Sequence, residues 1–366
     1  MEKSEIVASP DIRKVLIRSA NWVGDAVMSL PAITSVRLSF PRAEIAILAK
    51  PWVAELFRHG PSVDRVILYQ DRGIHQGIHG KWRLAKELKK EKFDLSVLLQ
   101  NAFEAAFIAY LARIPRRAGY DTDGRNFLLT HAVTRDQEIK KNHQIDYYLG
   151  MVEALGFVRA GRIPHLGVPS ERQEEACRML DALGIKEMEE IIGISPGATY
   201  GSAKQWFPDR YGKLAERIGK DLGARILVFG SRGDKKVGLQ VCHHSGVPLI
   251  DLTGLTTLSQ AMALIARCRL FITNDSGLMH VAAALNTPLI ALFGSTNSQR
   301  TGPRGELCRV ISKPLSCAPC MKPECPERRQ CMEQISVDEV YEEVRKIWEI
   351  SPSPFPSSPL SGERAG

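Results

Sequence analysis

Glycine-containing turns followed by charged or hydroxyl side chains occur after several apolar runs of this sequence. In the first half, Asn21-Trp22-Val23-Gly24-Asp25 follows the apolar run at residues 14–18. Such a turn brings backbone N–H groups to the end of a strand. It also places Asp25 at the start of a helix, where the helix dipole stabilises a charged carboxylate. Asp25 is therefore either a functional carboxylate facing a cleft or only a helix cap.

The second segment is Ser195-Pro196-Gly197-Ala198-Thr199-Tyr200-Gly201-Ser202-Ala203-Lys204-Gln205-Trp206. Small and hydroxyl residues, among them Thr199 and Ser202, allow a loop to wrap closely around phosphates, and Lys204 can neutralise them. The order of residues is not that of a P-loop. The alternative is an ordinary Gly/Ser connection that carries one surface lysine.

The third segment, residues 273–284, reads Thr-Asn-Asp-Ser-Gly-Leu-Met-His followed by four small or apolar residues. The N–H groups of Ser276, Gly277 and Leu278 would begin a helix, an arrangement that binds a diphosphate without a metal. Asp275 can accept hydrogen bonds from sugar hydroxyls, and His280 lies one turn further along. The alternative is a simple helix cap with His280 buried.

A fourth turn, residues 229–234, ends at Asp234. An acidic residue at this place can hold ribose hydroxyls, as in dinucleotide-binding folds, although a simple turn is an equal alternative. Three loops of the second half thus follow strands. Because the carboxyl ends of parallel strands share one edge of a sheet, their convergence predicts a nucleotide site.

Short apolar strands alternate with helical patterns in both halves, which indicates βαβ units and parallel sheets. The predicted strands are residues 14–18, 44–49, 65–69 and 95–99, then 191–195, 225–229, 248–251, 270–273 and 288–293. We therefore expect an α/β protein of two facing Rossmann-like domains with a cleft between them. The segment 163–169 is the expected linker.

The 366 residues are too many for one ordinary core, so two domains are expected. The boundaries we predict are 1–165 and 166–350, followed by a Pro- and Ser-rich disordered tail at 351–366. No apolar run approaches the length of a membrane span, and no signal peptide is visible at the N-terminus, so a cytoplasmic protein is expected.

The net charge of +8 is concentrated in the first half. Residues 1–170 contain 25 Lys and Arg against 18 Asp and Glu, whereas residues 171–366 contain 24 against 23. A basic surface favours nucleic acid, anionic lipid or a phosphorylated saccharide. The alternative is that the protein is basic without a specific anionic partner.

Five of the eight cysteines lie within residues 308–331. The last four, with spacing C-x2-C-x4-C-x5-C, could bind zinc as four thiolates: Cys317, Cys320, Cys325 and Cys331. A metal-binding or redox-sensing protein is therefore a remote alternative, although the paired CxxC…CxxC form is missing.

Three quoted segments, SANWVGDAVMSLPA, PGATYGSAKQW and TNDSGLMHVAAALNTPLIALFGSTN, resemble the ADP-heptose:lipopolysaccharide heptosyltransferases of glycosyltransferase family 9. The Trp-Val-Gly-Asp and Ala-Lys-x-Trp forms are more similar to the type II branch of that family than to type I. The likeness runs from about residue 14 to about residue 347.

The resemblance implies a GT-B fold in which the N-terminal domain binds the acceptor and the C-terminal domain binds the donor. It implies an inverting, metal-independent transfer of L-glycero-D-manno-heptose from ADP-heptose to the first heptose of the lipopolysaccharide inner core, without a cofactor. Asp25 matches the proposed general base, Lys204 the lysine on the donor diphosphate, and residues 275–278 the donor-binding turn. Related enzymes of type I or III, with another acceptor, remain an alternative.

The implied acceptor, heptosyl-Kdo2-lipid A, carries carboxylates and phosphates that suit the basic first domain. The candidate residues are Arg113, Arg116, Arg117 and Arg125. Peripheral contact with the cytoplasmic face of the inner membrane is expected, and nucleic acid is not an expected partner.

Overall fold

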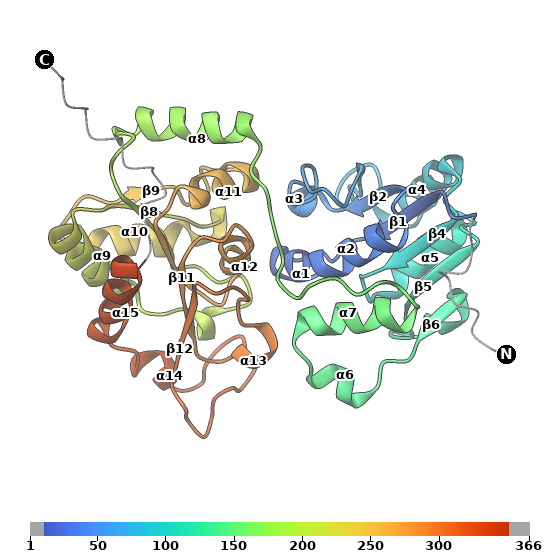
Figure 1. The fold of residues 1–366 in the computed structure, drawn as a ribbon. Helices are drawn as coiled ribbons and strands as arrows, with labels where there is room; N and C mark the ends of the chain where they lie inside the picture. Colours follow the sequence, from blue (N-terminus) through green and yellow to red (C-terminus); the bar gives the residue numbers. More distant parts are fainter. Residues whose placement is uncertain (1–10, 351–366) are drawn as a thin grey trace, which may run out of the picture. The chain divides into compact units, whose positions relative to one another are not determined.

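A computed structural model describes residues 11–350, which form two α/β units (Figure 1). The first unit ends at Gly167 and the second begins at Val168. The predicted tail at 351–366 lies outside the described residues.

The first unit is built on a six-stranded parallel sheet. Its strands are β1 (Lys14–Arg18), β2 (Glu44–Ala49), β3 (Arg65–Leu68), β4 (Leu95–Leu98), β5 (Arg116–Tyr120) and β6 (His131–Val133). They lie in the order β3-β2-β1-β4-β5-β6, and each neighbouring pair is parallel. The order therefore reverses between β1 and β4.

Helices cover both faces of this sheet, which explains why its central strands are continuous apolar runs. They are α1 (Val23–Met28), α2 (Leu30–Ser39), α3 (Pro51–Ala54), α4 (Gly77–Glu91), α5 (Phe103–Leu111), the 3-10 turn η2 (Asn126–Leu128), α6 (Gln137–Lys141) and α7 (Gln144–Ala154). Helices α4 and α5 pack together over Leu16 and Leu48, whereas α7 packs against α1 and α2.

The second unit repeats this plan. Its strands are β7 (Ile191–Ser195), β8 (Arg225–Val228), β9 (Ile250–Asp251), β10 (Leu270–Asn274), β11 (Leu289–Phe293) and β12 (Cys308–Ser312). They lie in the order β12-β11-β10-β7-β8-β9, and all neighbouring pairs are parallel. Counted from β7, the order is the same as in the first unit, with its reversal between β7 and β10.

The helical elements of the second unit are α8 (Ser170–Ala182), η3 (Ser202–Lys204), α9 (Pro208–Leu222), η4 (Arg232–Asp234), α10 (Lys235–His243), α11 (Leu258–Ala266), α12 (Gly277–Ala284), α13 (Ser298–Thr301), α14 (Gln330–Glu333) and α15 (Val337–Ile350). Helix α9 packs against α10 and α15, while α11 packs against α8 and α12. The largest core side chain is Trp206, which is fully buried.

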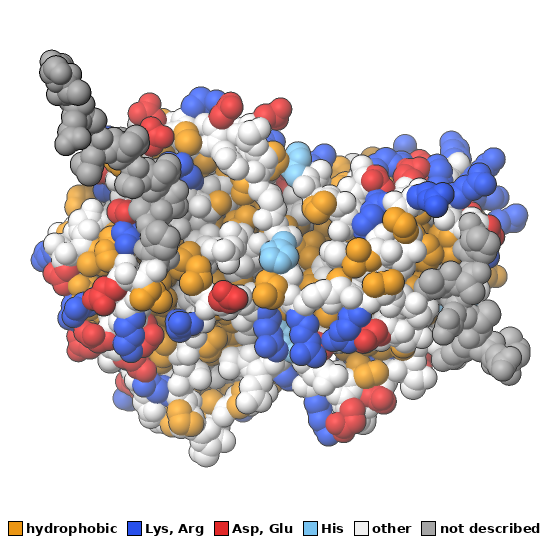
Figure 2. Space-filling model, viewed as in Figure 1, with side chains coloured by type: hydrophobic (Ala, Val, Ile, Leu, Met, Phe, Trp, Pro, Cys, Tyr) orange, Lys and Arg blue, Asp and Glu red, His pale blue; other side chains and the backbone are white. Residues whose placement is uncertain are grey.

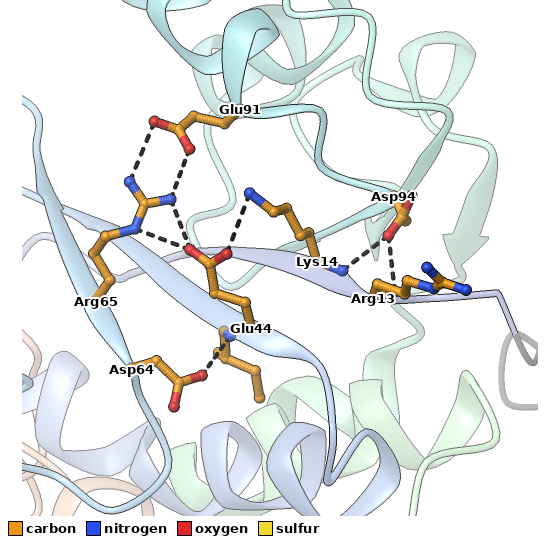
Figure 3. Close-up of polar contacts among 8 residues, drawn as sticks. Arg13, Lys14, Glu44, Asp64, Arg65, Glu91 and Asp94 are labelled. Atoms are coloured by element: carbon orange, nitrogen blue, oxygen red, sulfur yellow. Dashed lines mark hydrogen bonds and ion pairs between the residues drawn. The ribbon is translucent and has the colours of Figure 1, made fainter.

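Charged side chains tie together the amino edge of the first sheet (Figure 3). Arg65 bridges Glu44 at 2.9 Å and Glu91 at 2.8 Å, and Lys14 reaches Glu44 at 3.2 Å. Asp94 accepts hydrogen bonds from the backbone N–H groups of Arg13 and Lys14, both at 2.8 Å. The chemistry described below lies at the opposite, carboxyl edges of the sheets.

Within residues 11–350, no helix combines the length and the apolar character that crossing a bilayer would require.

Candidate active site

The loops that follow β7 and β10 flank the point where the strand order of the second sheet reverses. In open α/β sheets, ligands bind at this place, outside the carboxyl ends of the strands. Thr273 of β10 lies in register with Ser195 of β7, so the two loops begin side by side. These loops carry the second and third segments singled out from the sequence.

Lys204 and Asp275 form an ion pair across the reversal point. The Lys204 Nζ lies 2.6 Å from the Asp275 Oδ2, and the side chains are only 14% and 6% exposed. Thr296, in the loop after β11, also donates its hydroxyl to the same carboxylate oxygen at 2.6 Å. The ring of Tyr200 lies 4.9 Å from the Lys204 ammonium and contributes a cation–π contact. A charged pair is thus held at a ligand-binding edge.

Asn274 holds the Lys204 loop to the end of β10. Its Oδ1 accepts hydrogen bonds from the Trp206 N–H and the Tyr211 hydroxyl, both at 3.0 Å, and its Nδ2 donates to the Pro196 carbonyl at 2.7 Å. Asn274 is fully buried, so losing these partners would leave polar groups unpaired in the core.

Trp206 explains the spacing of the Ala-Lys-x-Trp motif. Lys204 is the last residue of the 3-10 turn η3, and the extended Gln205 that follows leads the chain to Trp206. Trp206 is buried in the core of the second unit and donates its Nε1–H to the Ile335 carbonyl at 3.0 Å. Lys204 is left at the ligand edge.

Helix α12 begins beside this ion pair. Ser276 is its N-cap, and its hydroxyl accepts from the Met279 N–H at 3.4 Å and lies 3.1 Å from the Thr273 hydroxyl. The N–H groups of Gly277 and Leu278 belong to the first turn, which has no partners within the helix. Both residues are half-buried, whereas His280 is buried. An anion placed here would meet two backbone donors and the positive end of the helix dipole.

Asp234 closes a tight turn after β8. Its Oδ2 accepts from the Ser231 N–H at 2.8 Å and the Ser231 hydroxyl at 2.6 Å, which forms a capping box. Its Oδ1 lies close to Gly197, where an added Cβ would come within 2.2 Å of it. Asp234 therefore has the structural role that the sequence left open, and it also borders the Lys204 loop through Gly197.

A groove of about 850 Å³ opens next to this turn, lined in part by Ser202, Asp234, Lys236 and Arg329. It shares Ser202 and Asp234 with the predicted donor residues. Lys204, Asp275 and Ser276 do not line it, so the groove does not coincide with the phosphate site that the sequence predicts at these residues. Thr199 and Ser202 are exposed on the loop that borders it.

In the first unit, Asp25 lies in the first turn of α1, directly after β1, and is half-buried. Two contacts hold the turn that precedes it. Arg18 donates to the Asn21 Oδ1 at 2.9 Å, and the Trp52 Nε1–H donates to the Asn21 carbonyl at 2.8 Å. Tyr148 is buried nearby, and its pKa is raised first by burial and then by the charge of Asp25. The carboxylate stands at the carboxyl edge of the first sheet.

The structure does not bring the four candidate acceptor arginines together with Asp25. Arg116 and Arg117 begin β5, and Arg113 lies three residues before it, so these three lie at the amino edge. Arg116 reaches Asp11 at 3.2 Å, while Arg117 donates to the carbonyls of Ile114 and Leu128.

Arg125 lies in the loop after β5, at the carboxyl edge of the sheet, but its side chain is fully buried. Its guanidinium donates to the carbonyls of Tyr120, Gln100 and Ala102 and thereby joins the loops after β4 and β5. Burial lowers the pKa of Arg125 to about 10. We therefore assign it to folding of these loops rather than to ligand contact.

The four cysteines of the zinc alternative do not share one environment. Cys331 is buried and Cys317 is exposed, while Cys320 and Cys325 are half-buried. Among residues 11–350, no group of three or more His, Cys, Asp or Glu side chains is arranged to hold a metal ion. This geometry gives the zinc alternative no support.

Two residues that sequence reasoning passed over complete the site, Asn274 and Thr296. Both stand in the long segment that carries the family resemblance, yet neither has a charge or a motif of its own. Only their position in the sequence could have indicated a place in the site. Asn274 ends an apolar strand and Thr296 follows one, at the same sheet edge as Lys204.

Comparison with known proteins covers most of the chain. The sequence profile of glycosyltransferase family 9 (heptosyltransferase) matches residues 81–330. Lipooligosaccharide heptosyltransferase 2 of Haemophilus ducreyi is 32% identical over 311 residues, which cover 81% of this chain and 88% of the relative. Lipopolysaccharide heptosyltransferase 2 of Escherichia coli is 31% identical over 309 residues, covering 81% and 87%.

Solved structures agree. The E. coli ADP-heptose LPS heptosyltransferase II superposes with a TM-score of 0.78 at 28% identity, covering 91% of this chain and 98% of that one. A family 9 glycosyltransferase from Veillonella parvula has a TM-score of 0.82 at 23% identity, covering 93% and 98%, and supports the fold alone. The predicted GT-B class, with two Rossmann-like domains, is confirmed. On the profile match and the identity to these relatives, the chain belongs to glycosyltransferase family 9 and is a glycosyltransferase.

Proposed function

We propose that this chain transfers L-glycero-D-manno-heptose from ADP-heptose to the first heptose of the lipopolysaccharide inner core, with inversion and without a metal. The observation that carries the proposal is the Lys204–Asp275 pair beside the start of α12. It stands at the ligand edge of a chain whose relatives are named heptosyltransferase 2.

On the donor side, negative charge develops on ADP as the bond between the anomeric carbon and the phosphate oxygen breaks. Lys204 and the first-turn N–H groups of α12 oppose that charge. When a phosphate oxygen replaces Asp275 as the partner of the Lys204 ammonium, the Asp275 carboxylate can accept hydrogen bonds from hydroxyls of the donor sugar. The Asp234 Oδ1, which borders the same loop, is our candidate for the donor ribose.

On the acceptor side, Asp25 takes the proton of the attacking hydroxyl. The hydroxyl oxygen attacks the anomeric carbon on the face opposite to the leaving ADP, which inverts that centre. Asp25 is suited to this role because it follows β1 in a turn that Arg18 and Trp52 hold in place.

The experiment that tests this function offers two acceptors to the purified protein with ADP-heptose. Heptosylated Kdo2-lipid A should gain the mass of one further heptose, and Kdo2-lipid A without heptose should not. Transfer only to the second acceptor would replace the proposal by a type I activity, and transfer to neither would remove it.

We further propose that the enzyme meets its lipid-linked acceptor at the cytoplasmic face of the inner membrane through α4. Ile78 and Trp82, one turn apart on this helix, are 53% and 50% exposed, and three exposed lysines follow: Lys86, Lys89 and Lys90. Figure 2 shows Lys and Arg side chains gathered over this part of the first unit. Apolar side chains beside a basic face suit an anionic lipid surface.

Co-sedimentation with vesicles tests this contact. Wild type should bind vesicles that contain anionic lipid and not neutral ones, and the triple change of Lys86, Lys89 and Lys90 to Gln should abolish binding. The matched control changes Lys213 and Lys220 of α9 to Gln, because these exposed lysines lie in the second unit. Equal losses in both variants would show a nonspecific charge effect and contradict the proposal.

A further inference from the structure

None of the steps proposed above uses residues 315–331, which we call the cysteine segment. The segment follows β12 and leads into α14. Its cysteines drew attention in the sequence, but its backbone and one arginine make the contacts that matter here.

The backbone of the cysteine segment is bonded to the Lys204 loop at two points. The Ala203 N–H donates to the Pro323 carbonyl at 3.0 Å, and the Tyr200 hydroxyl donates to the Met321 carbonyl at 2.8 Å. Between them lies Gly201, with a φ of 153°. A Cβ at Gly201 would come within 2.1 Å of the Pro323 carbonyl oxygen, so only glycine permits this approach.

Arg329 adds a third point of attachment. Its Nη1 donates to the carbonyls of Ser202 at 3.3 Å and Gln205 at 3.0 Å, which are the residues on either side of Ala203 and Lys204. Its guanidinium also lies 4.4 Å from the ring centre of Phe207. Arg329 has a left-handed φ of 54°, which is unusual for a residue with a side chain.

The cysteine segment also contacts the other side of the ion pair. The Met321 N–H donates to the Ser295 carbonyl at 2.7 Å, and the next residue, Thr296, donates to Asp275. Tyr200, held by Met321, faces the Lys204 ammonium. A single segment therefore reaches both the lysine and the carboxylate of the donor site.

We propose that the cysteine segment is a positioning element for the donor diphosphate, and that Arg329 is its main positioning residue. An ammonium on a four-carbon stem has many conformations, so its placement depends on how firmly its backbone is held. The inference deepens the proposed function and rests on it only for the role of Lys204 at the diphosphate.

The test measures ADP binding by calorimetry and steady-state kinetics for Arg329→Ala. The Kd of ADP and the KM of the sugar donor should rise on the order of 10–100-fold, because a small misplacement of a contact group has effects of this size. The KM of the acceptor should stay unchanged. Wild-type ADP affinity in a folded Arg329→Ala protein would overturn the proposal.

A double variant separates positioning from general destabilisation. If Arg329 acts through Lys204, then Arg329→Ala added to Lys204→Ala should weaken ADP binding by less than about threefold, since coupled residues are not additive. If the fold-losses in ADP affinity of the two single variants multiply in the double variant, Arg329 acts independently of Lys204, which would contradict the proposal.

Two arginines serve as matched controls. Arg328 is the exposed neighbour, and Arg328→Ala should bind ADP as wild type does. Arg210 donates to the Met332 and Ile335 carbonyls but to none in the Lys204 loop, so Arg210→Ala should lower the unfolding temperature with little effect on ADP affinity. If Arg210→Ala weakens ADP binding as much as Arg329→Ala does, then Arg329 contributes only to stability.

Gly201→Ala is the second test should Arg329→Ala fail to fold. It keeps every arginine but forces the Lys204 loop away from Pro323, and it should weaken ADP binding to a similar degree. ADP affinity equal to wild type would overturn the proposal. ADP binding requires neither heptose nor acceptor, so the two proposals can fail separately. If no heptose is transferred but ADP binding still depends on Arg329, only the proposed function is rejected.

Discussion

Lys204 and Trp206 show how a two-residue spacing serves two tasks in one loop. The indole anchors the loop in the core, and the lysine remains at the sheet edge with Asp275. In the proposed reaction, Lys204 opposes negative charge both when the donor binds and when ADP leaves.

Lys204→Ala should therefore weaken ADP-sugar binding and slow turnover together. We expect kcat/KM to fall on the order of 10²-fold or more, as for other lost charge contacts at a leaving group. Steady-state kinetics and calorimetry check this. Kinetics indistinguishable from wild type would return Lys204 to a purely structural ion pair.

Asp25→Asn distinguishes a base from a structural carboxylate, because Asp25 is the third residue of α1, whose N-cap is Trp22. Asparagine keeps the shape but lacks the basic oxygen and the charge. A base predicts normal folding, near-normal ADP-heptose binding and a turnover loss on the order of 10²–10⁴-fold. Near wild-type turnover in a folded variant would show that the base lies elsewhere.

Chemistry-bearing residues next to strand ends were predictable, because the parallel sheet fixes which ends share an edge. Lys204, Asp275 and Ser276 come together in this way. The places of the four candidate acceptor arginines could not be predicted from charge, since charge alone does not say which edge of the sheet a residue occupies. Arg125 shows a further limit, because a buried guanidinium bonded to carbonyls looks like a surface arginine in a sequence.

At the scale of elements, the strands with apolar runs were predicted nearly residue by residue, including β1, β2 and β7. Three strands were missed: β5, β6 and β12. Strand β5 reads Arg-Arg-Ala-Gly-Tyr, and its two arginines suggested a ligand surface. Its strand character comes from pairing with β4 and β6, which is a tertiary effect that propensity does not contain.

The amino edge of the first sheet gives a prediction for pH. The Arg65 hydrogen bond lowers the pKa of Glu91, so this pair stabilises the fold above the unfolded pKa of the carboxyl. The contribution is lost as pH falls through the lowered pKa. Glu91→Gln should cost about 0.2–1 kcal/mol at pH 7, because water and salt screen a partly exposed pair.

Urea unfolding at pH 7 and at progressively lower pH checks this, and the difference from wild type should shrink and then disappear once the pH is below the lowered pKa of Glu91. Glu349→Gln on α15 is the control, because its pair with Arg345 at 3.4 Å is more exposed. A Glu91 difference that persists in acid would rule out the ion pair as its cause.

At the scale of the whole molecule, every proposed donor contact lies after residue 190, within a unit that has its own sheet and core. Residues 168–366 expressed alone should therefore bind ADP, and residues 1–167 should not. Calorimetry on both pieces and on the full chain decides this. ADP binding confined to residues 1–167 would reverse the assignment of donor and acceptor units.

Transfer should also survive EDTA, because Lys204 and the N–H groups that begin α12 oppose the diphosphate charge. We expect initial rates with chelator to stay within about twofold of the rate with added magnesium, since such groups replace a metal as charge stabiliser. A rate that depends absolutely on magnesium would require a different donor site.

Helix α15, the last helix among the described residues, packs through Val340, Val344 and Ile347 into the core of the second unit. Among the described residues, the two units are contiguous stretches of chain that meet at residues 167 and 168. A genetic crossover at that junction would exchange one complete half for the corresponding half of a relative and would cut neither hydrophobic core. Under the proposed division of donor and acceptor binding between the units, the two preferences would be inherited separately, and we expect recombination at this junction to produce new sugar linkages.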